Sequence, residues 1–289
     1  MIDALEIFRA LADSSRLRIL RLLRTMELSV GELAQVLGQS QPRVSRHVKI
    51  LCDAGLAERR KEGSWVFVAL GPAEAVAPVA AALDGWEAAA PDRQAAADVA
   101  RLAEEQVEAA MLAALGDAPV GRLIDIGTGT GRMIELFAPR AHTALGIDRS
   151  SEMLRLARAK LGEQGLANVE LRQADLYALP MGDGEADVAI IHHVLHFAQQ
   201  PGAAIVEAAR VLAPGGRLLI ADFAPHDREE LRAQDAHTRL GFSDAQIERW
   251  FAAAGLTLAK VETLAGGELT VKLWLGVRQG AALREVKAA

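Results

Sequence analysis

The sequence predicts an α/β protein in which a small winged helix-turn-helix domain precedes a Rossmann-like domain with a mostly parallel, doubly wound sheet. Between Leu5 and Leu70 the apolar residues first recur at helical spacing and then alternate. After Gly121, short β-rich runs alternate with helical stretches. Residues 123–131 read LIDIGTGTG, an apolar run that leads into three alternating glycines. Such glycines allow a tight turn between a strand and a helix and a close approach to a ligand.

Length and composition predict more than one domain. The chain has 289 residues, of which 51% are apolar, enough for two hydrophobic cores. We expect a DNA-binding domain over residues 1–71, a helical linker or dimerisation segment over 72–118, a ligand-binding domain over 119–279 and a tail over 280–289.

Charge is distributed unevenly along the chain. Residues 1–70 contain 11 Lys and Arg against 8 Asp and Glu, and residues 71–289 contain 21 against 30. A basic N-terminal part therefore precedes an acidic one. The single cysteine, Cys52, excludes an intrachain disulfide and fits a reducing compartment. No secretory leader or membrane-spanning run is evident, so we expect a cytoplasmic protein that does not enter a membrane.

The first module contains the signals of a helix-turn-helix. Ser29 can cap a helix that ends at Gly38, and Ser40 can cap the next, with Pro42 in its first turn. In this second helix Val44, Val48 and Leu51 form the expected buried stripe. The residues expected to face outward and contact DNA are Gln41, Arg43, Ser45, Arg46, His47 and Lys49.

A β-hairpin is expected to follow, around Glu62, Gly63 and Ser64. Arg59, Arg60 and Lys61 near its tip suit a wing that contacts the DNA backbone. The alternative is that these charges only solvate a surface, but the charge run, the turn and the hairpin agree with one another, which favours DNA binding.

Residues 7–70 resemble the ArsR-type winged-helix regulators, through ALADSSRLRILRLL, SVGELAQVLGQSQPRVSRHVKIL, AGL and the wing. The resemblance implies a homodimer that reads double-stranded operator DNA with two-fold related half-sites. Metal-sensing members often carry two cysteines where this chain has Ser29 and Gly31, so metal or arsenite sensing is not expected there. We expect Cys52 to be a small buried side chain rather than a redox switch.

Arg93 to Leu115 contains neither proline nor glycine and should form one helix. Val99, Leu102, Val107 and Met111 are spaced to bury one side of it. The helix could cover the following sheet or serve dimerisation and signal transmission between the modules, and the sequence leaves both readings open.

The strand candidates of the second module place carboxylates at their carboxyl ends, where doubly wound sheets bind ligands. Asp148 follows the second strand and can accept both hydroxyls of a ribose. Its alternative role is to cap the helix expected over 151–164. Asp175 follows the third strand. The strand candidates are residues 122–126, 143–147, 169–172, 186–191 and 217–222.

The glycine spacing G-x-G-x-G differs from the dinucleotide pattern G-x-G-x-x-G and favours a ligand without a phosphate. With Asp125, Asp148, Asp175 and the later run VLAPGGRLLI, residues 119–278 resemble class I S-adenosylmethionine (SAM)-dependent methyltransferases. The resemblance implies binding of SAM or its product S-adenosylhomocysteine, with Asp148 at the ribose, Asp175 at the adenine amino group and Asp125 near the cationic end. The expected cofactor-binding residues are Asp125, Gly127, Thr128, Gly129, Gly131, Asp148, Arg149, Ala174, Asp175, Leu176 and His192.

Three histidines follow the fourth strand, at positions 192, 193 and 196. We expect no metal there, because neighbouring histidines point apart and no nearby carboxylate completes a three-ligand set. Weak candidates for a general base are His193, with His226 and His237 in a helical stretch expected over 223–241. Each of these could equally be a surface or capping residue.

Three functions are compatible with the sequence. The chain could be a transcriptional regulator, expected to be a repressor, that senses SAM or S-adenosylhomocysteine. Alternatively, it could be an active small-molecule methyltransferase that also regulates its own gene. Methylation of nucleic acid is disfavoured, because the second module is acidic and lacks an Asn/Asp-Pro-Pro-Tyr motif. The methyl acceptor cannot be read from the sequence.

Overall fold

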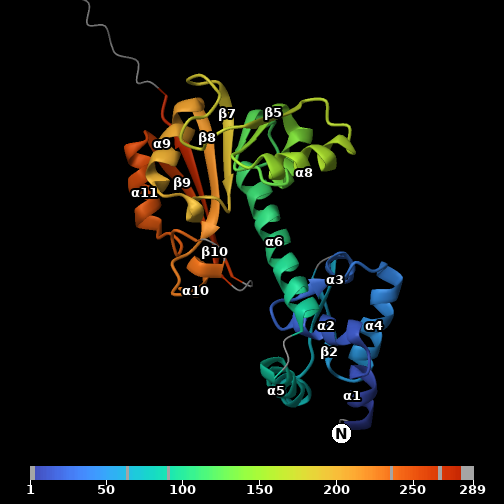
Figure 1. The fold of residues 1–289 in the computed structure, drawn as a ribbon. Helices are drawn as coiled ribbons and strands as arrows, with labels where there is room; N and C mark the ends of the chain where they lie inside the picture. The colour runs from blue at the N-terminus through green and yellow to red at the C-terminus, as the bar shows by residue number, and fades with distance from the viewer. Residues whose placement is uncertain (1–3, 63–64, 90–91, 235–236, 266–268, 281–289) are drawn as a thin grey trace, which may run out of the picture. The chain divides into compact units, whose positions relative to one another are not determined.

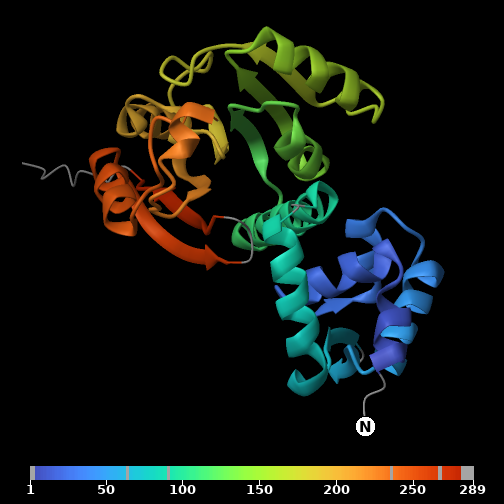
Figure 2. The ribbon, with the colours of Figure 1, turned by 60° about the horizontal axis from the view of Figure 1, so that its bottom comes forward.

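The computed structural model describes residues 4–62, 65–89, 92–234, 237–265 and 269–280. The chain divides into two compact units, and the division falls between Glu105 and Gln106, inside one long helix. In Figures 1 and 2 the blue and cyan elements belong to the first unit and the green to red strands to the second.

The first unit combines helices with a small antiparallel sheet of order β1-β3-β2. Its elements are α1 (Ala4–Leu11), α2 (Ser14–Leu23), β1 (Leu28–Ser29), α3 (Val30–Leu37), α4 (Gln41–Asp53), β2 (Ala57–Glu62), β3 (Trp65–Leu70) and α5 (Ala73–Ala89), followed by the beginning of α6 (Arg93–Leu115). The helix-turn-helix is α3 and α4, and the wing is the pair β2 and β3.

Local sequence signals explain where α3 begins and ends and which side of α4 is buried. The Ser29 hydroxyl accepts the N–H of Glu32 while the Glu32 carboxylate accepts the N–H of Ser29, a reciprocal cap of α3. Gly38 ends α3 with a φ of 64°, a conformation that favours glycine. Val44, Val48 and Leu51 of α4 are fully buried in the core of this unit, as expected.

The helix α5 runs without interruption through Pro78. Eight of its 17 residues are alanine, a strong helix former, and the side chains of Val79 and Leu83 pack into the core of this unit. Tertiary packing therefore outweighs the cost of the missing proline N–H.

The second unit is built on a seven-stranded sheet of order β6-β5-β4-β7-β8-β10-β9. The first five strands in this order pair in parallel, and β10 pairs antiparallel with both β8 and β9. The strands are β4 (Gly121–Ile126), β5 (Ala141–Asp148), β6 (Val169–Gln173), β7 (Ala186–His192), β8 (Leu212–Phe223), β9 (Leu256–Leu264) and β10 (Val271–Arg278). The expected doubly wound, mostly parallel sheet is confirmed.

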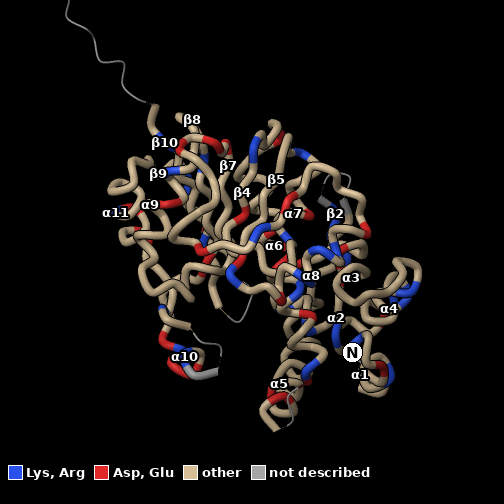
Figure 3. The backbone as a smooth tube through the Cα atoms, turned by 45° about the horizontal axis from the view of Figure 1, so that its top comes forward, with Lys and Arg blue, Asp and Glu red and all other residues tan. Residues whose placement is uncertain are grey.

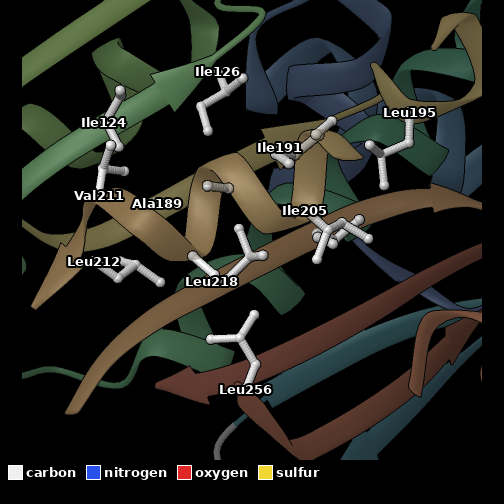
Figure 4. Packing of buried hydrophobic residues seen from close by; sticks show 14 of the residues in the cluster. Ile124, Ile126, Ala189, Ile191, Leu195, Ile205, Val211, Leu212, Leu218 and Leu256 are labelled. Atoms are coloured by element: carbon white, nitrogen blue, oxygen red, sulfur yellow. The ribbon is translucent and has the colours of Figure 1, made fainter. Parts of the chain in front are cut away.

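Helices cover both faces of this sheet. One face packs on α9 (Pro201–Val211) and α11 (Asp244–Ala253), and Figure 4 shows the aliphatic side chains of this core, among them Ile191, Ile205 and Leu218. The other face packs on the end of α6, on α7 (Arg132–Phe137) and on α8 (Ser151–Gly162). Because both faces are covered, the central strands are apolar on both sides.

The expectation of a helical stretch over 223–241 is wrong. Phe223 still belongs to β8, and the described part of the segment is irregular apart from the short α10 (Glu230–Gln234). Pro225 and the hydrogen bonds from Ala224 N–H to Thr270 and from His226 N–H to Leu240 hold the backbone in an extended path. None of the helices in the described ranges has the length and apolar character needed to span a bilayer.

Candidate functional site

A pocket lies at the carboxyl ends of the parallel strands of the second unit. Its cavity volume is about 740 Å³, within the range of small-molecule sites. The lining includes most of the cofactor-binding residues expected from the sequence: Gly127, Thr128, Gly129, Asp148, Arg149, Ala174, Asp175, Leu176 and His192. Asp125 and Gly131 are not among the lining residues, and Arg132, Tyr177 and Phe197 are.

The glycine loop after β4 forms the floor of this pocket. Gly127 has a φ of 78°, and a Cβ there would lie 2.5 Å from Val194 Cγ2. Gly129 has a φ of 53°, again in the region that favours glycine. The N–H groups of Gly127 and Thr128 both donate to the carbonyl of Ile147, at 2.9 and 2.7 Å. These bonds fix the loop against β5.

Asp148 ties the loop to the start of α8. One carboxylate oxygen accepts the N–H of Gly129 at 2.9 Å, and the other accepts the N–H of Ser150 at 2.8 Å. The residue that caps α8 is Ser150, whose hydroxyl accepts the N–H of Met153. The alternative role of Asp148 as the helix cap is therefore not what the structure shows.

Asp125 lies beneath the loop and is 1% exposed. Burial raises the pKa of its carboxyl from 3.8 to about 6, although the Thr128 side chain and His192 favour the ionised form and oppose the rise, to which the charge of Asp148 adds. Among the described residues Asp125 Oδ2 has no hydrogen-bond partner. A buried carboxylate of this kind favours a cation in its neighbourhood.

At the opposite side of the pocket, Asp175 follows β6. Its carboxylate accepts the N–H of Tyr177 at 2.9 Å, and the Tyr177 hydroxyl accepts the N–H of Gln200 at 3.0 Å. Leu176 and the Tyr177 ring therefore form an apolar wall next to a carboxylate, an arrangement suited to a planar ring with an amino group.

Of the three weak candidates for a general base, only His193 lines the pocket. His226 and His237 pack around the ring of Phe223, with centroid distances of 6.2 and 5.7 Å. Burial lowers the pKa of His226. The fully buried Asp222 was not expected here, although it ends a strand candidate. Its Oδ1 lies 2.8 Å from His196 Nδ1, so a carboxylate does lie near the histidines, contrary to the sequence argument.

Arg132, the first residue of α7, links the pocket to α6. Its guanidinium forms a bidentate pair with Glu108, at 2.5 Å for both contacts, and a further contact with Glu135 at 2.8 Å. Burial opposes ionisation of Glu135, but hydrogen bonds from Lys160 and Arg132 lower its pKa to about 2. The arginine that lines the pocket is thus held by α6 and α7 together.

On α4 the side chains of Gln41, Arg43, Arg46 and Lys49 are exposed, and Ser45 is half-buried. His47 is buried, contrary to the expectation that it faces outward. It lies three residues after Val44 and four before Leu51, which places it on the inner stripe of the helix. Burial lowers its pKa, despite Asp13 with an oxygen 3.7 Å from His47 Nδ1.

The three basic residues of the wing, Arg59, Arg60 and Lys61, are all exposed on β2. The basic positions of α4 and β2 are blue in Figure 3. Arg60 already pairs with Glu27 at 2.6 Å and with Glu58 at 2.8 Å, so part of its charge is neutralised within the domain. The described exposed basic residues of α4 and β2 form a surface suited to DNA phosphates. We refer to Arg43, Arg46, Lys49, Arg59, Arg60 and Lys61 as the basic surface.

Cys52 is half-buried and packs against the core of the first unit. Burial raises the pKa of its thiol, which disfavours the reactive thiolate. Cys52 therefore packs against the core, as expected, but it is only partly buried.

Comparisons with known proteins identify two separate regions. Residues 13–59 match the family model of bacterial regulatory proteins of the arsR family, and residues 124–220 match a methyltransferase domain. The arsenical resistance operon repressor of Escherichia coli is 45% identical over 69 residues, 24% of this chain and 59% of the repressor. The phosphatidylethanolamine N-methyltransferase of Cereibacter sphaeroides is 34% identical over 156 residues, 52% of this chain and 76% of that enzyme.

The chain spans less than half the length of two other relatives, 43% of a protein of a Streptomyces fradiae transposon and 42% of the Bacillus subtilis methyltransferase YcgJ. Among solved structures, that of YcgJ matches with a TM-score of 0.54 at 21% identity, over 61% of this chain and 99% of YcgJ. At this identity the structural likeness shows the fold of the second unit.

Proposed function

Because this chain belongs to the class I SAM-dependent methyltransferases and carries an ArsR-type winged-helix domain before the methyltransferase domain, we propose that it is a DNA-binding transcriptional regulator that senses SAM or S-adenosylhomocysteine. The observation that carries this proposal is the presence of a pocket lined by a glycine loop and two carboxylates, with the buried Asp125 beneath the loop, in the same chain as an exposed basic surface. We expect it to act as a homodimeric repressor on double-stranded operator DNA in the cytoplasm.

The pocket suits each part of SAM. The ribose hydroxyls would donate to Asp148, whose oxygens already hold the loop, and the adenine would lie against Leu176 with its amino group toward Asp175. The buried carboxylate of Asp125 would favour the positively charged methionine end, with His192 on the lining nearby. Gly127, Thr128 and Gly129 would pass under the same end.

Sensing requires that the ligand binds two states of the protein with different affinity. The ligand then changes DNA affinity by the ratio of those affinities, and DNA changes ligand affinity by the same factor. SAM and S-adenosylhomocysteine differ by one methyl group and one positive charge, so Asp125 provides a physical basis for telling them apart.

The test is binding of the full chain to DNA from upstream of its own gene, at matched salt, without ligand, with SAM and with S-adenosylhomocysteine. We expect one ligand to change DNA affinity by about 5- to 150-fold, the usual range of coupling between sites. Equal DNA affinity under all three conditions would refute sensing.

Asp148→Ala should abolish SAM binding and the response to SAM, while ligand-free DNA binding stays at the wild-type value. Asp117→Ala is the matched control, because Asp117 is an exposed aspartate of the same unit outside the pocket lining. SAM affinity that survives Asp148→Ala would show that this carboxylate serves only the loop.

The second candidate function is an active small-molecule methyltransferase that also regulates its own gene. It is favoured by His193, which lines the pocket and could accept a proton from a methyl acceptor. The test is transfer of labelled methyl groups from SAM to metabolite and macromolecule fractions of a cell extract. Label in the metabolite fraction that disappears with His193→Ala would support this function, and no label in any fraction would count against it.

A further inference from the structure

Five of the seven histidines of the chain gather at the end of β7 and β8. The ring centroids of His193, His196, His226 and His237 lie 4.8 to 6.2 Å from that of Phe223. His192 lies 4.5 Å from His193. Imidazole is a common metal ligand in its neutral form, and packing of the core does not require so many of them in one place.

A fully buried carboxylate lies beside this histidine group. Asp222 is 0% exposed, and its Oδ1 lies 2.8 Å from His196 Nδ1. The N–H of Phe223 donates to Oδ1 at 2.8 Å, and the N–H of His196 donates to Oδ2 at 3.3 Å. These contacts orient the carboxylate, but a buried carboxylate is stabilised most by a positive charge.

The position of Asp222 follows from the sheet. In the parallel pair of β7 and β8, His192 is opposite Ala221, so Asp222 comes one residue beyond the end of β7. His196 returns to it through the short turn after β7. Residues 26 apart in sequence are therefore brought together by strand register.

His193 has an unusual backbone conformation. Its φ is 53°, the only positive value among the described residues other than glycine. Its N–H donates to the carbonyl of Ala221 at 2.8 Å, which holds the turn in place. A histidine in this region of backbone space is strained, and such strain gathers at functional sites. The turn leaves His193 both on the pocket lining and beside Phe223.

We propose that His193, His196 and Asp222 bind a divalent transition-metal ion at the inner side of the pocket. One ligand atom from each of the three residues lies within 4.8 Å of the other two. Metal bonds of about 2.0–2.2 Å place two ligand atoms roughly 3.3 Å from one another. Small side-chain rotations would therefore bring the more distant ligand atoms close enough to bind one ion. His196 Nδ1 and Asp222 Oδ1 are 2.8 Å apart, a hydrogen-bond distance, so these two atoms would move apart slightly to admit the ion.

The donor set defines the class of ion. Two imidazoles and one carboxylate suit Zn²⁺, Fe²⁺ or Co²⁺, whereas Mg²⁺ and Ca²⁺ require a shell of oxygen ligands. The ion takes the place of the proton between His196 Nδ1 and Asp222 Oδ1, and that proton is released to solvent. Of the three residues only His193 lines the pocket, so water or a bound molecule would reach the ion from the side of His193.

The experiment uses the untagged full chain, freed of metal with a chelator and dialysed. Titration with Co²⁺, followed by its visible absorption, and with Zn²⁺, followed by calorimetry, should give one ion per chain with proton release. We expect His193→Ala and Asp222→Asn to weaken binding by about 100-fold or more, since loss of an outer-sphere partner alone costs 10- to 100-fold.

Two variants serve as controls. His142→Ala removes an exposed histidine of β5, and His226→Ala removes a histidine that packs on Phe223 but is outside the three-residue set; both should retain binding. Thermal unfolding of each variant establishes whether it folds. If the variant Asp222→Asn does not fold, because the substitution is in the core, His193→Ala still tests the proposal. Absence of stoichiometric binding by the wild type, or wild-type binding by His193→Ala, would overturn the proposal. Neither outcome depends on SAM binding.

Discussion

At the residue scale, Asp125 couples the stability of the second unit to ligand binding. Burial raises its pKa in the folded chain to about 6, so the folded state holds a proton more tightly than the unfolded state, where the pKa is near 3.8. Stability contributed by the neutral acid is therefore lost as the pH rises through 6. One pKa unit corresponds to about 1.36 kcal/mol, so at neutral pH the burial of the ionised carboxylate lowers the free energy of unfolding by on the order of 3 kcal/mol.

We predict that Asp125→Asn stabilises the ligand-free chain at pH 7.5 by up to about 3 kcal/mol, because the amide avoids burial of a charge. The gain should shrink as the pH is lowered toward 4. Urea unfolding of variant and wild type over this pH range measures it. A gain that does not vary with pH would show that packing, rather than ionisation, is the cause.

The same substitution should weaken SAM binding, since the cation would lose its carboxylate. In the wild type, SAM affinity should fall by about tenfold per pH unit below 6, as Asp125 takes up its proton. In Asp125→Asn this dependence should disappear, which calorimetry at several pH values can check. Stability and ligand affinity would then change in opposite directions at one position.

Single residues show what sequence reasoning can and cannot reach. The glycine loop and Asp148 were predictable, because positive φ values and a strand-end carboxylate have local signals. The orientation of His47 was also within reach, since its spacing from Val44 and Leu51 is that of the buried stripe. Asp222 was not, because its neighbour His196 is 26 residues away and meets it only through the register of β7 and β8.

At the scale of elements, α6 has its N-terminal half fixed to the helix-turn-helix. Asp98, 1% exposed, forms a bidentate pair with Arg18 of α2, in which Nη2 lies 2.7 Å from Oδ1. Arg101 of α6 donates to the carbonyl of Val36 at the end of α3, at 2.9 Å. The first part of α6 is thus part of the DNA-binding unit, and the sequence, which indicated the full length of the helix, did not reveal this.

We predict that Asp98→Ala lowers the free energy of unfolding of the first unit by about 3–5 kcal/mol, because it leaves Arg18 largely buried without its partner. Operator DNA binding should weaken with it. Urea unfolding followed by circular dichroism, together with fluorescence anisotropy of labelled DNA, measures both effects.

Asp84→Ala is the matched control, since Asp84 pairs with Arg24 of the same α2 at 2.7 Å but its side chain is 61% exposed. An exposed pair contributes about 1 kcal/mol or less. If the two variants lose the same free energy of unfolding, burial is not the reason why the pair of Arg18 and Asp98 stabilises the unit.

One segment departed from the sequence expectation. Residues 223–241 suggested a helix, yet long-range backbone hydrogen bonds to Thr270 and Leu240 hold part of this segment in an extended path. Propensity is a weak local preference that tertiary contacts override. Where periodicity was long and unbroken, as over 93–115, the helix was predicted to its ends.

At the scale of the whole molecule, the chain has a net charge of −6, so DNA binding must come from the basic surface against an unfavourable overall charge. We predict a steep loss of DNA affinity with salt. Arg46→Ala should reduce the slope of log affinity against log salt by about 1 per contacted phosphate lost, measured by anisotropy at several salt concentrations.

Arg60→Ala should change that slope by less, although Arg60 is also exposed, because Glu27 and Glu58 already neutralise it. An equal effect of the two substitutions would mean that DNA displaces both glutamates. A slope that neither substitution changes would place the phosphate contacts outside the basic surface.

The strand order of the large sheet has a consequence for the time course of synthesis. β10 lies between β8 and β9, so β8 gains its second neighbour only after residue 271 has been made. The elements packed into the first unit end at residue 105. Domains generally fold as they leave the ribosome, N-terminal first. The DNA-binding unit should therefore be complete while the strand that carries Asp222 still has an open edge, which makes that edge the point at which a nascent chain most needs protection from aggregation.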